Sequence, residues 1–390
     1  MRMVPNGRRG KIIAAAAAAV VVALIVAGVV QLAGGGRSAR GASAAAGSQG
    51  GIAGEAGNPN LDPGTALHGP APDFTLVNQF GQPMSLHQFR GKAVILAFND
   101  SQCTTVCPLT TSAMTEARQL LGAAGDKVQL LGVDANPQAT SIADVRSYSS
   151  AHGMLNQWDF LTGTPGQLEA VWKAYHIAVQ IQAGQIDHTP ALLVIGPDGQ
   201  QRMLYLTAMA YDSIDQQAQV LAAETSKLLP GHPPLTRTRS EGYVAGTSPA
   251  ARVSLPAVPT ASGSGPVQLG AGRPHLLMFF ATWLQETSDL RGQLTALGQY
   301  AQAARAGRLP PLAAVDQAGT EPSRGAAAAF ARSLPYPVAV DSTGQLADGY
   351  GVQDQPWYVL TSAAGKIIWH HDGWLPPSQL ISQVRQAASR

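Results

Sequence analysis

The stretch NDSQCTTVCPLTTSAM, residues 99–114, contains both cysteines of the 390-residue chain. Cys103 and Cys107 are four positions apart, and Pro108 follows directly. The continuous apolar run AVILAF at 93–98 precedes the stretch and is typical of a buried parallel strand, whereas a helical pattern follows it. A strand that leads through two thiols into a helix predicts an α/β fold with the thiols close to a strand end.

The spacing of the two cysteines gives them a defined geometry. Residues four apart share one face of the first turn of a helix, with about 5–6 Å between their β carbons. Two sulfurs placed in this way can bind one metal ion or, after local adjustment, form a disulfide. The positive end of the helix stabilises a thiolate, which both reactions require, and Pro108 suits a helix start because its missing N–H needs no partner there. Two buried cysteines without a role are the alternative.

His188 is a candidate third ligand, although a lone histidine on a loop is more often an ordinary structural residue. It lies in QIDHTPALLVIGPDG, on a predicted loop before the buried strand 191–196. Loops at strand ends in such sheets gather around one site, and Thr189-Pro190 is placed where redox folds of this type have a cis-proline loop beside the cysteines. Thiolate together with imidazole suits copper. Asp187 could orient His188, and Asp134 at the end of another predicted strand could face the site. The alternative for each carboxylate is an ordinary solvated position on a loop or strand end, and for Asp134 this is the favoured interpretation.

Composition and apolar patterning divide the chain into parts. An uncharged run at 12–32 meets the requirement of about 20 apolar residues for a bilayer span. Basic residues before it predict a cytoplasmic N-terminus and extracytoplasmic domains, although small residues after it also allow a cleaved signal peptide. Stretches rich in Gly, Ser and Pro predict flexible connections. The predicted parts are a cytoplasmic N-terminus at 1–11, a transmembrane anchor at 12–33, a tether at 34–68, a first domain at 69–229, a linker at 230–266 and a second domain at 267–390.

Bulk properties exclude several classes of protein. Hydrophobic residues make up 45% of the chain, which is enough for folded cores. The net charge is +2 and no basic block occurs beyond the N-terminus, so nothing indicates nucleic-acid binding. Two cysteines are too few for a disulfide-scaffolded module. The strand and helix order of the first domain is repeated in the second, which indicates a divergent internal duplication.

Several motifs taken together resemble the Sco/SenC family over about residues 70–228. They are APDFTLVNQFGQPMSLHQFRGKAVILAF, CTTVCP, LLGVDANP, FLTGTPGQLEAVWKAYHI and DHTPALLVIGPDG. The resemblance implies a thioredoxin-like fold, copper bound as Cu(I) or Cu(II) by Cys103, Cys107 and His188, and delivery of copper to the binuclear centre of cytochrome c oxidase. Some members of the family act as thiol-disulfide reductants. The chain departs from the family in NDSQ before the first cysteine and Thr104 after it, and these neighbours influence thiol acidity.

The second domain resembles membrane-tethered thioredoxin-like proteins of the TlpA/ResA kind. The stretch FFATWLQETSDLRGQL carries Leu284 and Thr287 where the resemblance implies two cysteines, and Pro356 occupies the position of a cis-proline. Because this domain has no thiols, it cannot perform disulfide exchange, and we expect a docking or packing module. The fold prediction is therefore two tandem thioredoxin-like domains behind an N-terminal transmembrane helix.

These features leave three functional hypotheses. The first is a membrane-anchored copper metallochaperone whose partner is the copper-bearing subunit of cytochrome c oxidase or another copper or thiol acceptor. The second is an extracytoplasmic thiol-disulfide oxidoreductase that uses Cys103 and Cys107 as a redox-active pair. The third is a non-catalytic interaction or redox-sensing protein, which the thiol-free domain would suit.

Overall fold

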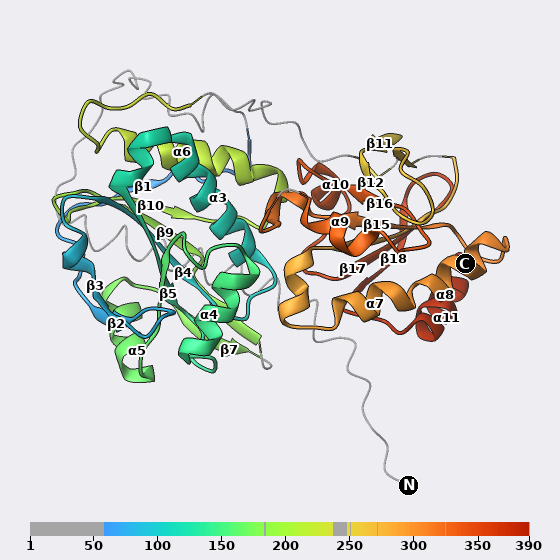
Figure 1. Ribbon diagram of the computed structural model, residues 1–390, viewed down its shortest axis with the longest axis horizontal. Helices are drawn as coiled ribbons and strands as arrows, with labels where there is room; N and C mark the ends of the chain where they lie inside the picture. Colours follow the sequence, from blue (N-terminus) through green and yellow to red (C-terminus); the bar gives the residue numbers. More distant parts are fainter. Residues whose placement is uncertain are drawn as a thin grey trace, which may run out of the picture. The chain divides into compact units, whose positions relative to one another are not determined.

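The computed structural model describes residues 58–182, 185–236, 248–249, 251–270, 272–323 and 325–389. These residues belong to one compact unit that contains two α/β domains (Figure 1). The predicted cytoplasmic N-terminus, the transmembrane anchor and most of the tether lie outside the described residues. Within those ranges no helix is both long and apolar enough to cross a membrane.

The first domain is built on a six-stranded sheet with the order β1-β10-β9-β4-β5-β6. β4 is parallel to β5 and antiparallel to β9, and β9 is antiparallel to β10. Two parallel strands beside an antiparallel pair, in the order β5-β4-β9-β10, form the thioredoxin-like arrangement that the sequence predicted. The strands are β1 (Thr65–Ala66), β4 (Ala93–Asn99), β5 (Val128–Asp134), β6 (Asp159–Leu161), β9 (Ala191–Ile195) and β10 (Gln201–Leu206).

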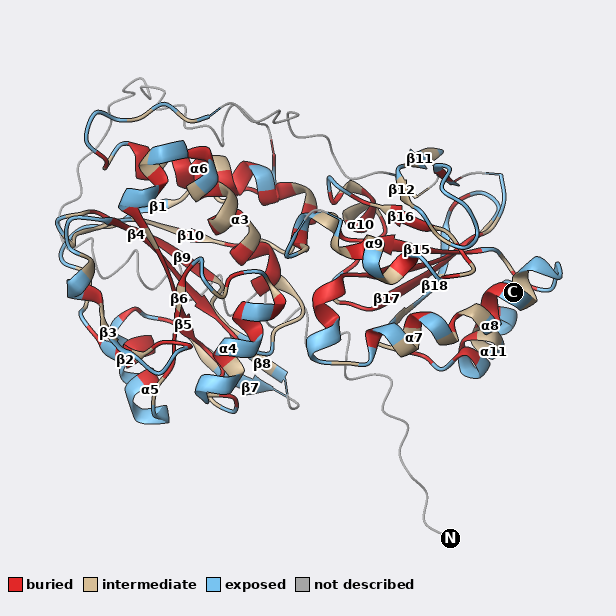
Figure 2. Ribbon diagram, in the orientation of Figure 1, coloured by how far each residue is buried: buried red, intermediate tan, exposed pale blue. Residues whose placement is uncertain are grey.

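Both faces of this sheet are covered, because successive residues of a strand point to opposite sides. From β4, Ile95 packs in a cluster with α3, α4 and α6, whereas Leu96 and Phe98 pack in a cluster with α5 and the hairpin β2–β3. Figure 2 shows the central strands as almost entirely buried. The covering elements are β2 (Thr75–Val77), β3 (Pro83–Ser85), α3 (Val106–Leu120), α4 (Ile142–Ala151), α5 (Pro165–Ala174) and α6 (Ile214–Ser226).

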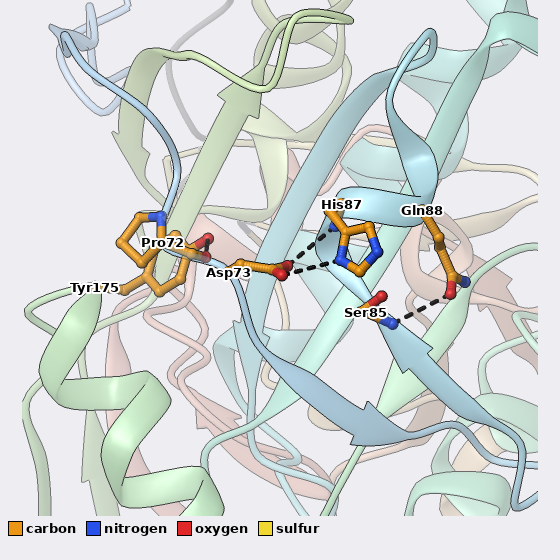
Figure 3. Close-up of polar contacts among 6 residues, drawn as sticks. All are labelled: Pro72, Asp73, Ser85, His87, Gln88 and Tyr175. Carbon is orange, nitrogen blue, oxygen red and sulfur yellow. Dashed lines mark hydrogen bonds and ion pairs between the residues drawn. The ribbon is translucent and has the colours of Figure 1, made fainter.

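Polar contacts fasten the segment that leads into the hairpin (Figure 3). The Asp73 carboxylate accepts a hydrogen bond from the backbone N–H of His87 at 3.0 Å, and the Nδ1 atom of His87 lies 3.0 Å from the same carboxylate. The Tyr175 hydroxyl donates to the carbonyl of Pro72 at 2.7 Å. These contacts connect the start of the domain to the short helix η1 (Leu86–Phe89) and to the end of α5.

The second domain repeats the strand arrangement of the first. Its sheet has the order β12-β16-β15-β14-β17-β18, with β14 parallel to β15 and antiparallel to β17, and β17 antiparallel to β18. The strands of this sheet are β12 (Ala257–Val258), β14 (Leu276–Phe280), β15 (Leu312–Asp316), β16 (Val338–Val340), β17 (Trp357–Thr361) and β18 (Ile367–Asp372). The helices are α7 (Leu290–Ala296), α8 (Gly298–Arg305), α9 (Ala326–Ala331), α10 (Gln345–Gly349) and α11 (Pro377–Ala388).

The two boundaries predicted around the first domain differ from the structure. Asn58 is buried and donates hydrogen bonds to Ser213 and Gln216, and β1 pairs with β10, so folded structure begins inside the predicted tether. The predicted linker 230–266 contains β12 and also β11 (Val253–Leu255), which pairs with β13 (Val267–Leu269). Strands of two or three residues are too short to show an alternating pattern, so the partner strand and not the local sequence determines them.

One buried apolar cluster extends through both domains. In β14, Leu276 and Phe280 belong to a cluster confined almost entirely to the second domain, whereas Phe279 belongs to the cluster that includes Cys107 and Met114 of the first. Continuous burial of this kind resembles a domain core more than a loose contact between domains. The two domains therefore support each other through apolar burial as well as through polar contacts.

Candidate metal and redox site

The two thiols lie in and just after the turn that joins β4 to α3. Because α3 begins at Val106, Cys103 precedes the helix and only Cys107 lies in its first turn, so the prediction that both thiols share a helix face was wrong. The backbone N–H of Cys107 nevertheless donates to the sulfur of Cys103 at 3.4 Å. Both residues are free thiols, with Cys103 half-buried and Cys107 only 1% exposed.

The pKa values of the two thiols are shifted in opposite directions. A hydrogen bond from the Cys107 side chain lowers the pKa of Cys103, in spite of burial, which acts in the opposite direction. Burial raises the pKa of Cys107 well above its ordinary value, and the hydrogen bond to Cys103 adds to this effect. Cys103 is therefore the more acidic of the two thiols, so it is the sulfur that becomes a nucleophilic thiolate more readily.

His188 reaches the same sulfur pair from a separate two-stranded sheet. It ends β8 (Gln185–His188), which pairs with β7 (Val179–Gln182), so it lies on a strand end and not on a free loop as predicted. Its Nε2 atom is 3.6 Å from the sulfur of Cys107, and its Nδ1 atom is 3.1 Å from the carbonyl oxygen of Thr189. Burial lowers the pKa of His188, which favours the neutral ring. A proton on Nδ1, shared with the carbonyl, leaves the lone pair of Nε2 facing Cys107.

A buried polar network that the sequence did not reveal holds the turn in place. The Asp100 carboxylate accepts hydrogen bonds from the N–H of Gln102 at 2.7 Å and from the side-chain amide of Asn136 at 2.6 Å. Asp134 accepts one from the N–H of Ser101 at 3.4 Å, and burial raises its pKa. Asp134, at the end of β5, therefore stabilises the turn through its hydrogen bond with Ser101. The Asp and Asn side chains that form such turns were the available sequence signal.

Two other expectations near His188, an orienting role for Asp187 and a cis bond before Pro190, differ from the structure. Asp187 is exposed, and because neighbouring residues of a strand point to opposite faces, it does not share the face of His188. The bond between Thr189 and Pro190 is not cis; in the described part of the chain the cis bond is Gln355–Pro356, in the second domain. The prediction of a cis-proline was thus correct for Pro356 and wrong for Pro190.

The three predicted ligands lie next to one another without forming a finished metal site. Among the residues with described positions, no group of three or more His, Cys, Asp or Glu side chains has the geometry needed to hold a metal ion. The contact between Cys107 and His188 and the contact between Cys103 and Cys107 nevertheless provide two sulfurs and one neutral imidazole. Thiolate and imidazole are the kinds of ligand that suit copper.

The corresponding turn of the second domain contains no thiol. After β14 the chain forms the short helix η4 (Thr282–Glu286), with Trp283 and Leu284 buried. The ring of Trp283 lies 4.8 Å from the ring of His152, at the end of α4 in the first domain. The turn after β14, which corresponds to the thiol turn of the first domain, therefore serves as a packing surface.

Comparison with known proteins finds relatives of the first domain. Residues 65–224 match the SCO1/SenC family model. A SCO1 protein homolog of Bacillus subtilis is 28% identical over 131 residues, which cover 32% of this chain and 68% of that protein. A protein of Stutzerimonas stutzeri named for copper binding is 30% identical over 139 residues, which cover 34% of this chain and 66% of that protein. The copper-bound ScoI structure of Bradyrhizobium japonicum is 20% identical, with a TM-score of 0.35, and covers 41% of this chain and 100% of that one.

Proposed function

We propose that the chain, whose residues 65–224 match the SCO1/SenC family model, binds one copper ion through Cys103, Cys107 and His188 and passes it to an acceptor protein. The proposed acceptor is the copper-bearing subunit of cytochrome c oxidase, as the family resemblance implies. The matched relatives cover only about a third of the chain, so the activity proposed for the whole protein rests mainly on its first domain.

The observation that carries the proposal is the approach of His188 to Cys107. Thiol-disulfide exchange needs no histidine at this position, whereas a metal ion held by two sulfurs gains a third ligand from it. The Nε2 atom lies 3.6 Å from the sulfur, while the carbonyl of Thr189 holds Nδ1. A hydrogen bond at the distal nitrogen is the usual way in which a protein orients a histidine ligand.

The acidities of the two thiols suggest how copper would enter. Cys103 is the more acidic and the more exposed of the two, so it would make the first contact with the incoming ion. Cys107 must lose its proton before it can bind, because the thiolate is the ligand form. The His188 ring is kept neutral by burial and needs no deprotonation.

The place of action in this proposal follows from the N-terminal sequence. The apolar run at 12–32 would anchor the chain in the cell membrane, with both domains on the outer side. Copper-bearing acceptors anchored in the same membrane would then meet the thiol site without free diffusion through the compartment.

The difference between the pKa shifts of Cys103 and Cys107 also supports the alternative proposal, a thiol-disulfide oxidoreductase. The Cys103 thiolate would attack an acceptor disulfide, form a mixed disulfide and release one acceptor thiolate. Cys107, once deprotonated, would then attack Cys103 and release the second acceptor thiolate. Two electrons pass to the acceptor, and Cys103 and Cys107 end as a disulfide. The two activities can coexist, because copper-site thiols must be reduced before they are loaded.

An anaerobic copper titration of the reduced full-length protein tests the proposal. Cu(I) and Cu(II) are added separately to the wild type, to His188→Ala, to the double variant Cys103→Ser/Cys107→Ser, and to His87→Ala as a control for loss of an exposed histidine. We expect one copper per chain, with a sulfur-to-copper charge-transfer band that disappears in His188→Ala and remains in His87→Ala.

Two results would contradict the metallochaperone. One is copper retention no greater than that of the double-serine variant. The other is copper binding that is unchanged in His188→Ala. A readily reversible disulfide between Cys103 and Cys107 without copper retention would make the oxidoreductase the better account.

A further inference from the structure

Thr207 lies between the helix that carries Cys107 and the segment that follows His188. It comes directly after β10 and is 5% exposed. Its backbone N–H donates to the carbonyl of Pro190 at 3.0 Å, which extends the pairing of β9 with β10 by one residue. Because His188 is two residues before Pro190, this hydrogen bond holds the segment that presents the imidazole.

The side chain of Thr207 contacts the thiol-bearing helix. The hydroxyl of Thr110, a residue of α3 that is 2% exposed, donates to the hydroxyl oxygen of Thr207 at 3.0 Å. The side-chain amide of Gln217, in α6, donates to the same oxygen at 3.5 Å. Thr110 follows Cys107 by three positions, so the two residues are neighbours on the surface of α3. Thr207 therefore bonds α3 with its side chain and the segment before β9 with its backbone.

These contacts form a closed ring that includes two of the predicted ligands. From Cys107 the ring passes along α3 to Thr110 and from there to Thr207. It continues through Pro190 to His188. The contact that closes the ring is the approach of the His188 Nε2 atom to the sulfur of Cys107 at 3.6 Å. Because sulfur is a weak hydrogen-bonding partner, we expect the two bonds of Thr207 to determine how far apart these two atoms lie.

We propose that Thr207 is a positioning residue of the thiol site, and that it keeps His188 beside Cys107 by holding α3 to the segment before β9. This inference rests on the proposed function, in which the sulfur and the imidazole bind one ion. Without the hydroxyl of Thr207, the imidazole would move away from the sulfur more often. A copper ion held by both groups would then lose its nitrogen ligand and leave the site more easily.

The structure offers variants that break this contact with little other damage. Thr207→Val removes the hydroxyl and keeps the backbone N–H that binds Pro190. The Thr110 hydroxyl can then donate to the carbonyl of Val106, which is 3.3 Å away in the same helix. Thr110→Val breaks the same bond from the other side, and Thr207→Ser is the conservative variant that keeps the hydroxyl. Thr111→Val is the matched control, because Thr111 is also 2% exposed in α3 and its hydroxyl donates to carbonyls of its own helix.

Hydrogen exchange in the reduced, copper-free full-length protein tests the contact itself. The reporters are the backbone amides of residues 189, 191 and 207, which flank or bind Pro190. We expect Thr207→Val and Thr110→Val each to accelerate this exchange about fivefold, in line with the loss of one hydrogen bond. The double variant should be no faster than the single variants, because both changes remove the same bond. Thr207→Ser and Thr111→Val should match the wild type at these amides.

Copper provides a readout that a merely structural role would not change. In the Cu(II) form, we expect the charge-transfer band of Thr207→Val to lose intensity towards the level of His188→Ala. Thr207→Ser and Thr111→Val should keep the band of the wild type. From the Cu(I) form, Thr207→Val should release copper to a chelator about fivefold faster than the wild type, again in line with one lost hydrogen bond.

Several results would overturn the positioning role of Thr207. They are an acceleration of exchange in Thr207→Val below about twofold, which is the range of ordinary surface substitutions, effects of Thr207→Val and Thr110→Val that multiply in the double variant, and an unchanged charge-transfer band in Thr207→Val. An effect of Thr111→Val as large as that of Thr207→Val would do the same. If the wild type binds no copper, the proposed function fails, but the exchange measurement still decides whether Thr207 holds the segment of His188 to α3.

Discussion

Replacement of Asp348 by alanine tests how the two domains are held together. The carboxylate of this α10 residue accepts hydrogen bonds from two successive backbone N–H groups of the first domain, those of Tyr211 and Asp212, each at 2.9 Å. Both N–H groups belong to the first turn of η3, which leads into α6 and has no helical carbonyl to receive them. Asp348 therefore caps a helix start that belongs to the other domain.

The expected cost follows from these two contacts. A buried donor left without a partner costs about 1–3 kcal/mol. The backbone of Tyr211 is buried and bears the full penalty, whereas Asp212 is half-buried and can recover part of it from water. We therefore expect Asp348→Ala to lower the free energy of unfolding by roughly 2–4 kcal/mol, and Asp348→Asn, which retains one acceptor oxygen, by about half as much.

The same site predicts a dependence on pH. Burial, together with the neighbouring Asp348, raises the pKa of Asp212 from 3.8 to about 7. Between these values the folded protein binds more protons than the unfolded chain, so this group makes the free energy of unfolding fall as the pH rises from about 4 to about 7. Asp212→Asn removes the titrating group and should flatten this part of the profile, and Asp348→Ala should flatten it in part because burial of Asp212 remains.

Urea unfolding of the full-length protein and its variants, followed by tryptophan fluorescence at several pH values, measures both effects. The wild type, Asp348→Ala, Asp348→Asn and Asp212→Asn are compared under one set of conditions. A loss below about 0.5 kcal/mol for Asp348→Ala, the range of ordinary surface substitutions, would refute the capping role. An unchanged pH profile in Asp212→Asn would refute the assignment of that titration.

Three further predictions concern the thiols, the domain boundary and the packing of η4. Limited alkylation of the reduced protein should modify Cys103 well before Cys107, because Cys107 is 1% exposed; peptide mass spectrometry checks this, and modification of Cys107 first would contradict it. Asn58→Ala should lower the unfolding free energy by about 1–3 kcal/mol, because Ser213 and Gln216 lose their buried donor. Thermal unfolding measures the change. Unchanged thermal stability would show that the folded part of the first domain begins after Asn58. Trp283→Ala should cost about 3–5 kcal/mol through loss of a buried ring packed on His152, and urea unfolding measures it; a loss below about 1 kcal/mol would mean that this packing is dispensable.

The sequence predicted the elements with strong periodic patterns and missed those that depend on distant partners. The apolar run at 93–98 became β4, because a short continuous apolar segment favours a buried strand. β1 and β12 were missed, since two residues carry no period. The cysteines and His188 were predicted together from a motif and a fold resemblance, and their proximity agrees with the structure. The hydrogen bonds from Tyr211 and Asp212 to Asp348 had no local signal, because they depend on how two separately predicted domains pack.

The 137 positions between Tyr211 and Asp348 are also a distance in time. That many residues must be added after Tyr211 before Asp348 exists, which takes on the order of 10–30 s at roughly 5–20 residues per second. During that interval a newly made first domain has the start of η3 without the carboxylate that accepts its N–H groups. The apolar residues of the first domain that share a cluster with Phe279 also stay uncovered until the second domain is made. The stability of the first domain is therefore tied to completion of the chain, and a ribosome that stalls between the domains would release a protein with this apolar face exposed.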